Sequence, residues 1–505
     1  MKSLSMSNKF YVTTPIYYVN DKPHIGHAYT TILADVLARF HRTAGDTTFF
    51  LTGLDEHGQK VQQAAEKRGM SPQDHCDDLA PRFLQLWEKL GIQYNDFIRT
   101  TQLRHVKLVQ DVLQKVHDNG DIYMAEYEGW YSVSEERFIT ETEKESGQFR
   151  DVKMLKERNW FFKMSKYQNQ LIDYINTHPE FLQPEHRKNE MLGFLKQPLG
   201  DLCISRPKSR MSWGIDIPFD REYVTYVWFD ALINYITAPG YLSDSKTFDL
   251  WWPADVHLIG KDILTTHAVY WPTMLFSIGL PLPKTIFAHG WWLIGQNKMS
   301  KSLGNVVNPL DLIDQYGVDS VRYYLMSEMV LGQDANFTME LFIKRFNSDL
   351  ANDYGNLLNR VSGLVGKYFD GVLPEQNGLT AAEEEIDAYG RSLPAMVDNH
   401  IRRLEVDKGL DSILRLIRMV NKYVENQAPW KVAKTDLKSA GRILYTAAEA
   451  LRMSSILLNP VMPTKTQEVL DVLGVSDRQA SWGQLKPGVK LKTHGALFPR
   501  LEMPG

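Results

Sequence analysis

Two histidines near the start of the chain have the types and spacing to act on phosphate. His24 and His27 are three residues apart, enclose Gly26, and precede a helical pattern. The first turn of a helix presents unpaired N–H groups and partial positive charge, which favours an anion. Glycine at this point lets a phosphate or a nucleobase approach the backbone. The two imidazoles could donate hydrogen bonds to a reacting α-phosphate, although the same residues are also ordinary neighbours of a helix cap.

A lysine pair much later in the chain complements the histidines. Lys298 and Lys301 lie in the run Lys-Met-Ser-Lys-Ser, which a leucine, a glycine and an asparagine follow. Lysines so spaced on a loop supply mobile point charges for a polyphosphate. Taken alone, the run is also typical of a solvated loop. The two clusters together predict that the chain binds a polyphosphate.

The elements around the histidines alternate between strand and helix patterns. A β-branched and aromatic run at 10–14 enters a loop at 15–23, and apolar residues at helical spacing follow over 32–40. A second strand pattern at 47–52 leads into the loop 53–58. This order is typical of a doubly wound parallel sheet, whose ligands lie at the carboxyl ends of the strands. We therefore expect an α/β catalytic domain with a Rossmann-type parallel sheet.

The rest of the chain divides by pattern. Strand patterns return at 223–228, 256–260 and 285–290. Beyond residue 346 only amphipathic helical stretches occur, which predicts an all-α helical bundle. These stretches cover 351–368, 382–405, 409–426 and 439–458. The predicted domains are the first half of the α/β domain at 1–118, an insertion at 119–222, the second half at 223–300, the lysine loop and the residues after it at 301–345, and the helical domain at 346–505.

Composition limits the class of protein. Lys+Arg number 57 against 61 Asp+Glu, a formal net charge of −4, so any polyanion must be held by local basic patches. Residues 401–450 carry such a bias, with 10 Lys/Arg against 6 Asp/Glu. Two cysteines are too few for a disulfide framework or a multi-thiolate zinc site. Neither a membrane-spanning apolar run nor a secretory leader is found, so we expect a soluble cytoplasmic protein, in the bacterial cytoplasm rather than an organelle.

Longer blocks of sequence resemble a known family. With the histidine and lysine clusters, the chain resembles the methionyl-tRNA synthetases of class I over its whole length. The blocks are YVTTPIYYVNDKPHIGH at 11–27, GLDEHG at 53–58, YVWFDALINY at 226–235, HLIGKDILTTHAVYWP at 257–272 and QAPWKVAK at 427–434. The resemblance implies activation of L-methionine with ATP and transfer of methionine to methionine tRNA, initiator and elongator. It assigns ATP to His24, Gly26, His27, Lys298 and Lys301, with Mg²⁺ accompanying ATP.

The resemblance also implies where methionine binds. The amino group needs a carboxylate, which Asp55 can supply from the end of a strand. We expect Tyr18 and His267 to be the hydrogen-bonding partners of the sulfur. The full set is Ile16, Tyr18, Asp55, Trp228, Ala231, Leu232, Tyr235, Ile263 and His267. Four of them share one face of a helix, a spacing that is also typical of plain core, and Leu232 stands where some relatives have proline.

The insertion departs from the family pattern. Many relatives carry a Cys-x-x-Cys zinc knuckle there, and this chain has Ser132 and Glu135 at the matching positions. Serine is a poor zinc ligand. We therefore predict no structural zinc, with the insertion held by aromatic packing of Tyr127, Trp130, Tyr131 and Phe138.

The resemblance assigns anticodon binding to the helical domain. It falls on Asn356, Arg360 and Trp430, and the alternative for Trp430 is a core tryptophan at a helix end. Exposed RNA loops are read by aromatic stacking and by amide and guanidinium contacts. Because the chain ends at Gly505 without an appended dimerisation module, we expect a monomer. Two alternatives stay open: a paralogue that binds tRNA or an amino acid without catalysis, and a class I synthetase for another amino acid.

Overall fold

The computed structural model describes residues 8–19, 23–132, 137–139, 141–147, 151–294, 297–298, 307–330 and 332–502. The chain forms two compact units. The first unit comprises Met1–Pro23, His41–Glu88 and Ile92–His289, and the second comprises His24–Phe40, Lys89–Gly91 and Gly290–Gly505.

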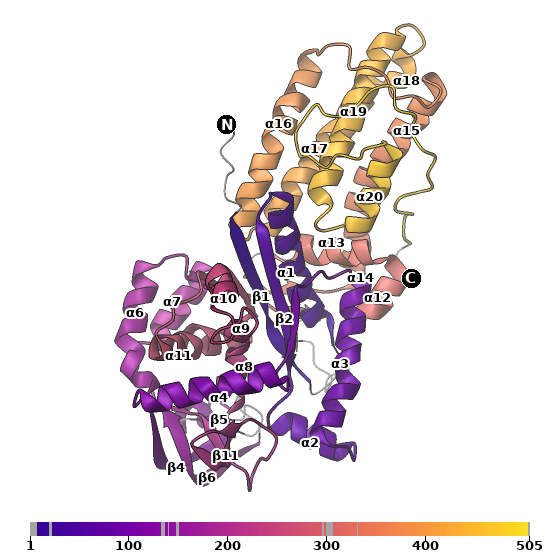
Figure 1. Ribbon diagram of the computed structural model, residues 1–505. Helices are drawn as coiled ribbons and strands as arrows, with labels where there is room; N and C mark the ends of the chain where they lie inside the picture. Colours follow the sequence, from indigo (N-terminus) through magenta and orange to yellow (C-terminus); the bar gives the residue numbers. More distant parts are fainter. Residues whose placement is uncertain are drawn as a thin grey trace. The chain divides into compact units, whose positions relative to one another are not determined.

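A six-stranded parallel sheet forms the centre of the first unit (Figure 1). In spatial order its strands are β3 (Asp96–Arg99), β2 (Thr47–Asp55), β1 (Lys9–Tyr18), β12 (Val256–Gly260), β13 (Thr285–His289) and β7 (Leu182–Gln183). The predicted Rossmann-type sheet is thus confirmed. β1 has β2 on one side and β12 on the other, so the strand order reverses there, and ligands of such sheets bind beyond the carboxyl ends at this point.

The loop predicted at 15–23 begins too early. β1 continues through Pro15 to Tyr18, and its register against β2 shifts between Thr13 and Ile16. Proline has no N–H for the ladder, and such an irregularity accommodates it inside a strand. The consequence is that Ile16 and Tyr18 are strand residues.

The region predicted as an insertion contains two antiparallel sheets. One has the order β5 (Arg137–Ile139), β4 (Ile122–Ser132), β6 (Val152–Phe162) and β8 (Leu202–Cys203), and the other β10 (Asp216–Ile217), β11 (Asp220–Thr225) and β9 (Ser205–Pro207). The prediction that the run 223–228 returns to the parallel sheet is wrong, because β11 pairs with β9 and β10 and helix α8 (Val227–Leu232) follows. The parallel strand β7 lies in this region instead, with two residues and no detectable pattern.

Helices cover the parallel sheet. The core includes Val109, Val112 and Leu113 of one of them, together with Tyr235 and Trp271. The helices and helical turns that matter below are α2 (Gln59–Lys67), α3 (Pro72–Lys89), α4 (Leu103–Asp118), α9 (Asn234–Thr237), a π-helical turn at Thr266–Tyr270 and α11 (Trp271–Ile278).

The second unit contains residues 25–40 of α1 (Ile25–Thr43), preceded by His24. It also contains a bundle of long helices that lie alongside one another (Figure 1). The bundle confirms the predicted helical domain. Its elements are α12 (Pro309–Tyr316), α13 (Val318–Glu328), α14 (Met339–Arg345), a π-helical segment at Phe346–Gly355, α15 (Asn356–Tyr368), α16 (Ala381–Arg402), α17 (Val406–Gln427), α18 (Pro429–Val432), α19 (Leu437–Leu458) and α20 (Pro463–Val472).

Local sequence sets the ends of these helices. Thr380 and Glu383 form a reciprocal capping box that starts α16. α17 ends where Ala428 adopts a left-handed conformation before Pro429. In the described part of the chain, no helix has the length and apolar character needed to cross a membrane.

Candidate functional site

The carboxyl ends of β1 and β2 bring three of the predicted residues of the methionine site together. Tyr18 is the register partner of Asp55, and Ile16 is the partner of Gly53. A methyl group on Gly53 would lie 2.0 Å from the carbonyl oxygen of Ile98, so only glycine allows β3 to approach. Asp55 is 4% exposed. The carboxylate is thus held at the edge where ligands of such a sheet bind.

Glu56 and His57, the two residues after Asp55, form hydrogen bonds with different parts of the chain. Glu56 is fully buried and accepts a hydrogen bond of 2.6 Å from Nε of Arg99 and another from the Thr101 hydroxyl. His57 Nδ1 lies 2.6 Å from an oxygen of Asp230. The loop that carries Asp55 is therefore fixed by buried polar bonds.

Asp230 joins three segments of the first unit. It is fully buried on α8, and its second carboxylate oxygen lies 2.7 Å from Nε2 of His105 on α4. His105 Nδ1 in turn lies 3.0 Å from the hydroxyl of Thr237 on α9. Burial alone would raise the pKa of Asp230, but its interactions with His57 and His105 hold that pKa below the usual range. Sequence reasoning missed this network. Its only signal was that His57 and Asp230 lie inside the family blocks.

A second buried network fixes the aromatic part of the site. The Tyr235 hydroxyl lies 2.8 Å from Nε2 of His267, and Nδ1 of His267 lies 3.0 Å from the carbonyl oxygen of Ile263. Because Nδ1 must donate to that carbonyl, Nε2 of the neutral ring accepts from Tyr235. Burial lowers the pKa of His267 to about 4, so the ring is neutral at physiological pH. Tyr11 donates its hydroxyl to the Tyr235 carbonyl at 2.8 Å.

These bonds change the expected role of His267. Both ring nitrogens are engaged within the protein, so His267 has no N–H left over for the methionine sulfur. Its observed contacts hold the ring of Tyr235, which also stacks on His257 at a centroid distance of 4.2 Å. A π-helical turn at Thr266–Tyr270 places His267, a geometry often found at functional sites.

The remaining pocket residues lie around this pair. The predicted single helical face is divided between α8 and α9. Ala231 and Leu232 are buried, whereas Trp228 and Ile263 are half-buried. The Trp228 ring lies edge-on to His267, with centroids 6.4 Å apart. The partly exposed side chains of Trp228 and Ile263 are thus available to contact a ligand.

In the second unit, the two histidines stand at the start of α1. The backbone N–H of His24 donates to Nδ1 of His27 at 3.1 Å, and that of Gly26 donates to Nδ1 of His24 at 3.1 Å. In the neutral rings the proton is therefore on Nε2. The rings stack with centroids 3.8 Å apart. A Cβ at residue 26 would lie 3.0 Å from the His24 ring, so a larger residue would require that ring to shift.

The lysine loop is described only in part. The backbone of Lys298 pairs with Leu293 in a short antiparallel ladder between β15 (Asn297–Lys298) and β14 (Trp292–Ile294). The side chain of Lys298 and the whole of Lys301 lie outside the described residues.

The expected anticodon-binding residues lie on α15 and next to it. Asn356 is exposed and Arg360 half-exposed on α15, four residues apart and so on one face. Trp430 is half-buried, and the Tyr368 hydroxyl at the end of α15 donates to its carbonyl at 3.2 Å. Trp430 is thus next to the end of the helix that carries the other two, and its ring is not fully enclosed in the core.

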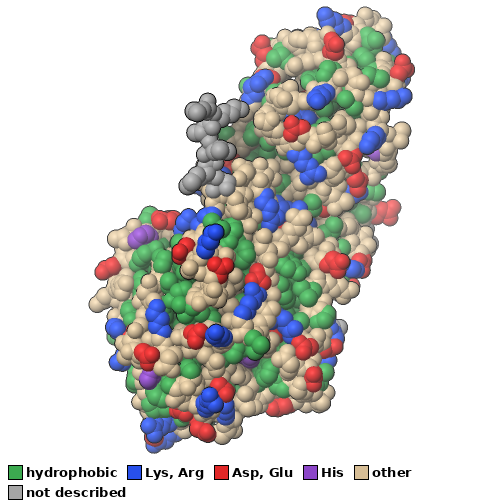
Figure 2. Space-filling model, viewed as in Figure 1, with side chains coloured by type: hydrophobic (Ala, Val, Ile, Leu, Met, Phe, Trp, Pro, Cys, Tyr) green, Lys and Arg blue, Asp and Glu red, His purple; other side chains and the backbone are tan. Residues whose placement is uncertain are grey.

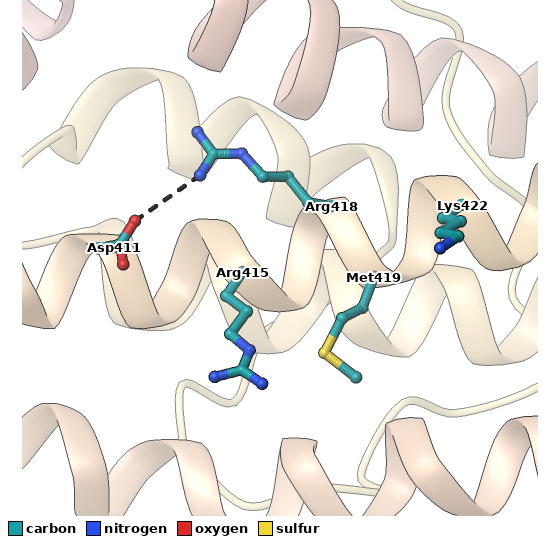
Figure 3. A pocket seen from close by; sticks show the side chains of 5 residues that line it. All are labelled: Asp411, Arg415, Arg418, Met419 and Lys422. Carbon is teal, nitrogen blue, oxygen red and sulfur yellow. Dashed lines mark ion pairs between the residues drawn. The ribbon is translucent and has the colours of Figure 1, made fainter.

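A shallow hollow of about 340 Å³ lies along one face of α17 (Figure 3). Arg418 pairs with Asp349 at 3.0 Å and Asp353 at 2.8 Å, whereas Arg415 lies over the Tyr389 ring. Arg415 and Met419 project from the same side of the helix (Figure 3). The lining residues are Asp411, Arg415, Arg418, Met419 and Lys422.

The charge of this hollow is only partly balanced. Among the ion pairs found between described residues, none involves Arg415 or Lys422. Elsewhere, on the face seen in Figure 2, basic and acidic side chains are interspersed. The α17 face therefore offers two cations that an external anion can use.

Possible metal ligands are scattered among the residues that the structure describes. Within the described ranges, no group of three or more His, Cys, Asp or Glu side chains could hold an ion. Cys76 is buried and points at the Glu56 carbonyl, and Cys203 lies beside Arg206. Ser132 ends β4 with its side chain buried, and Glu135 lies outside the described residues.

Cations lie over two of the four aromatic residues that were expected to hold the insertion, Tyr131 and Trp130. Arg206 and Arg210 lie over the ring of Tyr131, and Lys144 lies 3.4 Å from the centroid of Trp130. Cation–π contacts thus contribute at these two residues, and the expected packing among the four aromatic residues stays a prediction. The side chains of Tyr127 and Phe138 lie outside the description.

Comparison with known proteins gives consistent results. A family model described as tRNA synthetases class I (M) matches residues 10–147 and 148–362, and one described as the anticodon binding domain of methionyl tRNA ligase matches 373–502. The chain is 45% identical over 510 residues to the methionine–tRNA ligase of Caldanaerobacter subterraneus subsp. tengcongensis, covering 99% of this chain and 80% of that protein. It is 46% identical over 512 residues to that of Clostridium acetobutylicum, covering 99% and 79%.

Solved structures agree with these relatives. Mycobacterium tuberculosis methionyl-tRNA synthetase in complex with methionyl-adenylate matches with a TM-score of 0.94 and 39% identity, over 98% of this chain and 100% of that one. The apo form of the same enzyme matches with a TM-score of 0.86 and 37% identity, over 99% of each chain.

Proposed function

Because the chain belongs to the methionyl-tRNA synthetases of class I, we propose how its residues divide the work of the reaction. The enzyme is an aminoacyl-tRNA ligase. It activates L-methionine with ATP to methionyl-adenylate and pyrophosphate, then transfers methionine to the 3′ end of methionine tRNA. Both steps require reactants to be positioned and developing charge to be stabilised.

The methionine site is assigned to the first unit. Asp55 receives the ammonium group, and its place at the end of β2 supports this role. Trp228, Ala231 and Leu232 surround the side chain, and Tyr18 donates to the thioether. The hydrogen bonds of His267 support a positioning role, since it holds Tyr235 against the pocket. Ile16 and Ile263 complete the apolar lining.

The phosphates of ATP are assigned to the two clusters of the second unit. His24 and His27 donate from Nε2 to the α-phosphate, for which their Nδ1 contacts orient them. Lys298 and Lys301 neutralise the β- and γ-phosphates and the leaving pyrophosphate. Gly26 keeps the approach to the backbone open. These groups act where negative charge develops in the transition state.

The proposal includes Mg²⁺ as a companion of ATP and no structural zinc. Mg²⁺ enters bound to ATP, whose phosphate oxygens it prefers. It screens phosphate charge when bound. The donor set supports an insertion without zinc, because serine and glutamate replace the thiolates and neither cysteine belongs to a cluster of three or more possible ligands among the described residues.

The helical domain binds the tRNA anticodon through Asn356, Arg360 and Trp430. The exposure of this face of α15 supports the assignment. Arg415 and Lys422 of the α17 hollow add sequence-independent attraction for the RNA backbone. Initiator and elongator methionine tRNA are both substrates. The domain boundaries at 118, 222, 300 and 345, a monomeric state and a bacterial cytoplasmic location complete the proposal.

One experiment tests the catalytic assignment. ATP–pyrophosphate exchange is measured without tRNA for each of the twenty amino acids, and then for methionine with the Asp55→Asn variant. We expect exchange with methionine only, and a large rise in the methionine KM for Asp55→Asn. Exchange with another amino acid would refute the assignment of these residues to a methionine pocket. No exchange, with or without tRNA, would favour the non-catalytic paralogue.

A further inference from the structure

Asp230 lies between the two parts of the proposed methionine site. On α8 it lies two residues after Trp228 and directly before Ala231 and Leu232. Its carboxylate contacts His57, which comes two residues after Asp55. One buried side chain thus connects the loop that would bind the ammonium group with the helix that would line the thioether pocket.

The connection is short and enclosed. His57 and Asp230 are 6% and 0% exposed, and their contact measures 2.6 Å. Charge-assisted hydrogen bonds of this kind in a buried setting are strong and directional. The other carboxylate oxygen contacts His105 at 2.7 Å, which ties α8 to α4 as well.

The loop that carries Asp55 is also held by hydrogen bonds to Glu56. Glu56 is held by Arg99 and Thr101, so the residue between Asp55 and His57 cannot shift alone. After His57 the chain turns at Gly58, with φ of 108°. Breaking the bond to Asp230 would therefore free the loop at the point where it meets the pocket helix.

We propose that the His57–Asp230 bond sets the distance between the ammonium site and the thioether pocket, and so selects amino acids by side-chain length. The inference rests on the proposed function, because it takes Asp55 as the ammonium ligand. A pocket discriminates between substrates that differ by one methylene by roughly 10- to 200-fold in kcat/KM. It does so only while the residues that line it keep their positions. Asp230 is then a positioning residue that determines specificity without touching methionine.

The test compares substrates of different length. ATP–pyrophosphate exchange gives kcat/KM for methionine, for ethionine (one methylene longer) and for S-methylcysteine (one shorter). His57 and His105 contact different oxygens of the Asp230 carboxylate, so in Asp230→Asn one of the two histidines faces an NH2 donor in place of an acceptor. We expect the preference for methionine over each analogue to fall by about three- to tenfold, a part of the discrimination available per methylene. His57→Ala should act in the same way, and His57→Gln, which keeps a donor, should restore part of the preference.

A matched control separates this effect from a general loss of stability. Asp121 is also a buried carboxylate of the first unit, 1% exposed, and it contacts Lys166 at 2.6 Å and Ser277 at 2.8 Å. Asp121→Asn should lower the melting temperature and leave the preference unchanged. If Asp230→Asn does not fold, His57→Ala decides the question.

Two results would refute different statements. Folded Asp230→Asn and His57→Ala with the wild-type preference, even at lower activity, would overturn the length-selection inference alone. An Asp55→Asn variant with an unchanged methionine KM would instead refute the ammonium assignment in the proposed function.

Discussion

Acidification should destabilise this protein through His267. The side chain is 1% exposed, and burial lowers its pKa from 6.5 to about 4. Between pH 6.5 and pH 4 the unfolded chain binds a proton at this residue that the folded protein does not bind. Unfolding is therefore favoured as the pH falls through this range, and the contribution of His267 is complete above pH 6.5.

The size of the effect follows from the pKa difference. Between these two pKa values, each unit by which the pH falls lowers the free energy of unfolding by about 1.4 kcal/mol. Of the change from pH 7 to pH 5, about one and a half units lie below pH 6.5. The free energy of unfolding therefore falls by about 2 kcal/mol through His267. Protonation of Nε2 would also remove the acceptor that holds the Tyr235 hydroxyl.

The assay compares the wild type with His267→Gln. Glutamine can accept from Tyr235 and donate to the Ile263 carbonyl, but it does not titrate. Urea unfolding of both proteins, followed by tryptophan fluorescence at pH 7, 6 and 5, gives the loss of free energy in each. The difference between the two losses isolates His267, because His257 and the whole second unit are common to both proteins.

We expect the wild type to lose about 2 kcal/mol more than His267→Gln between pH 7 and pH 5. Equal losses in the two proteins would refute the argument. That result would mean that the buried ring takes up a proton in the folded state as easily as in the unfolded state.

Further predictions concern the phosphate, RNA and metal assignments. Lys301→Ala should slow adenylate formation by roughly 10²–10³ with little change in methionine binding; weak methionine binding with an unchanged activation rate would contradict its role. Trp430→Ala should leave ATP–pyrophosphate exchange intact and raise the tRNA KM by roughly tenfold, through the loss of one stacking contact; an equal loss in both half-reactions would make Trp430 a core residue. In the double variant Arg415→Gln/Lys422→Gln, the slope of log K for tRNA binding against log salt concentration should become shallower by about 1 to 2. Lys408 pairs with Glu405 at 2.8 Å, so the control variant Lys408→Gln should leave that slope nearly unchanged. Metal analysis of protein prepared without chelators should find no stoichiometric zinc, and one zinc per chain would overturn the assignment.

Local features of the sequence account for the parts of the fold that were predicted well. The helices α16, α17 and α19 begin and end within three residues of the predicted stretches. Their ends depend on neighbouring residues, such as the capping box at Thr380 and the Ala428–Pro429 stop. Periodicity and caps act over a few residues, so they can be read from the chain directly.

Strand membership was predicted less well. The run 223–228 has the composition of a buried parallel strand, yet β11 belongs to an antiparallel sheet. β7 joins the parallel sheet with two residues. A strand is stabilised by partners distant in the sequence, and its own residues do not specify which sheet provides them.

The sequence by itself determined the chemistry of the chain. The histidine and lysine clusters, the acidic loop at Asp55 and the family blocks identify residue types and order, which is all that recognition of the family requires. The folded chain decided how those residues are held. Asp230 bonds to His57 across 173 positions, and His267 is neutral because many distant residues exclude water from it. Hydrogen-bond distance and desolvation depend on which groups become neighbours in space, and that neighbourhood exists only after the chain has folded.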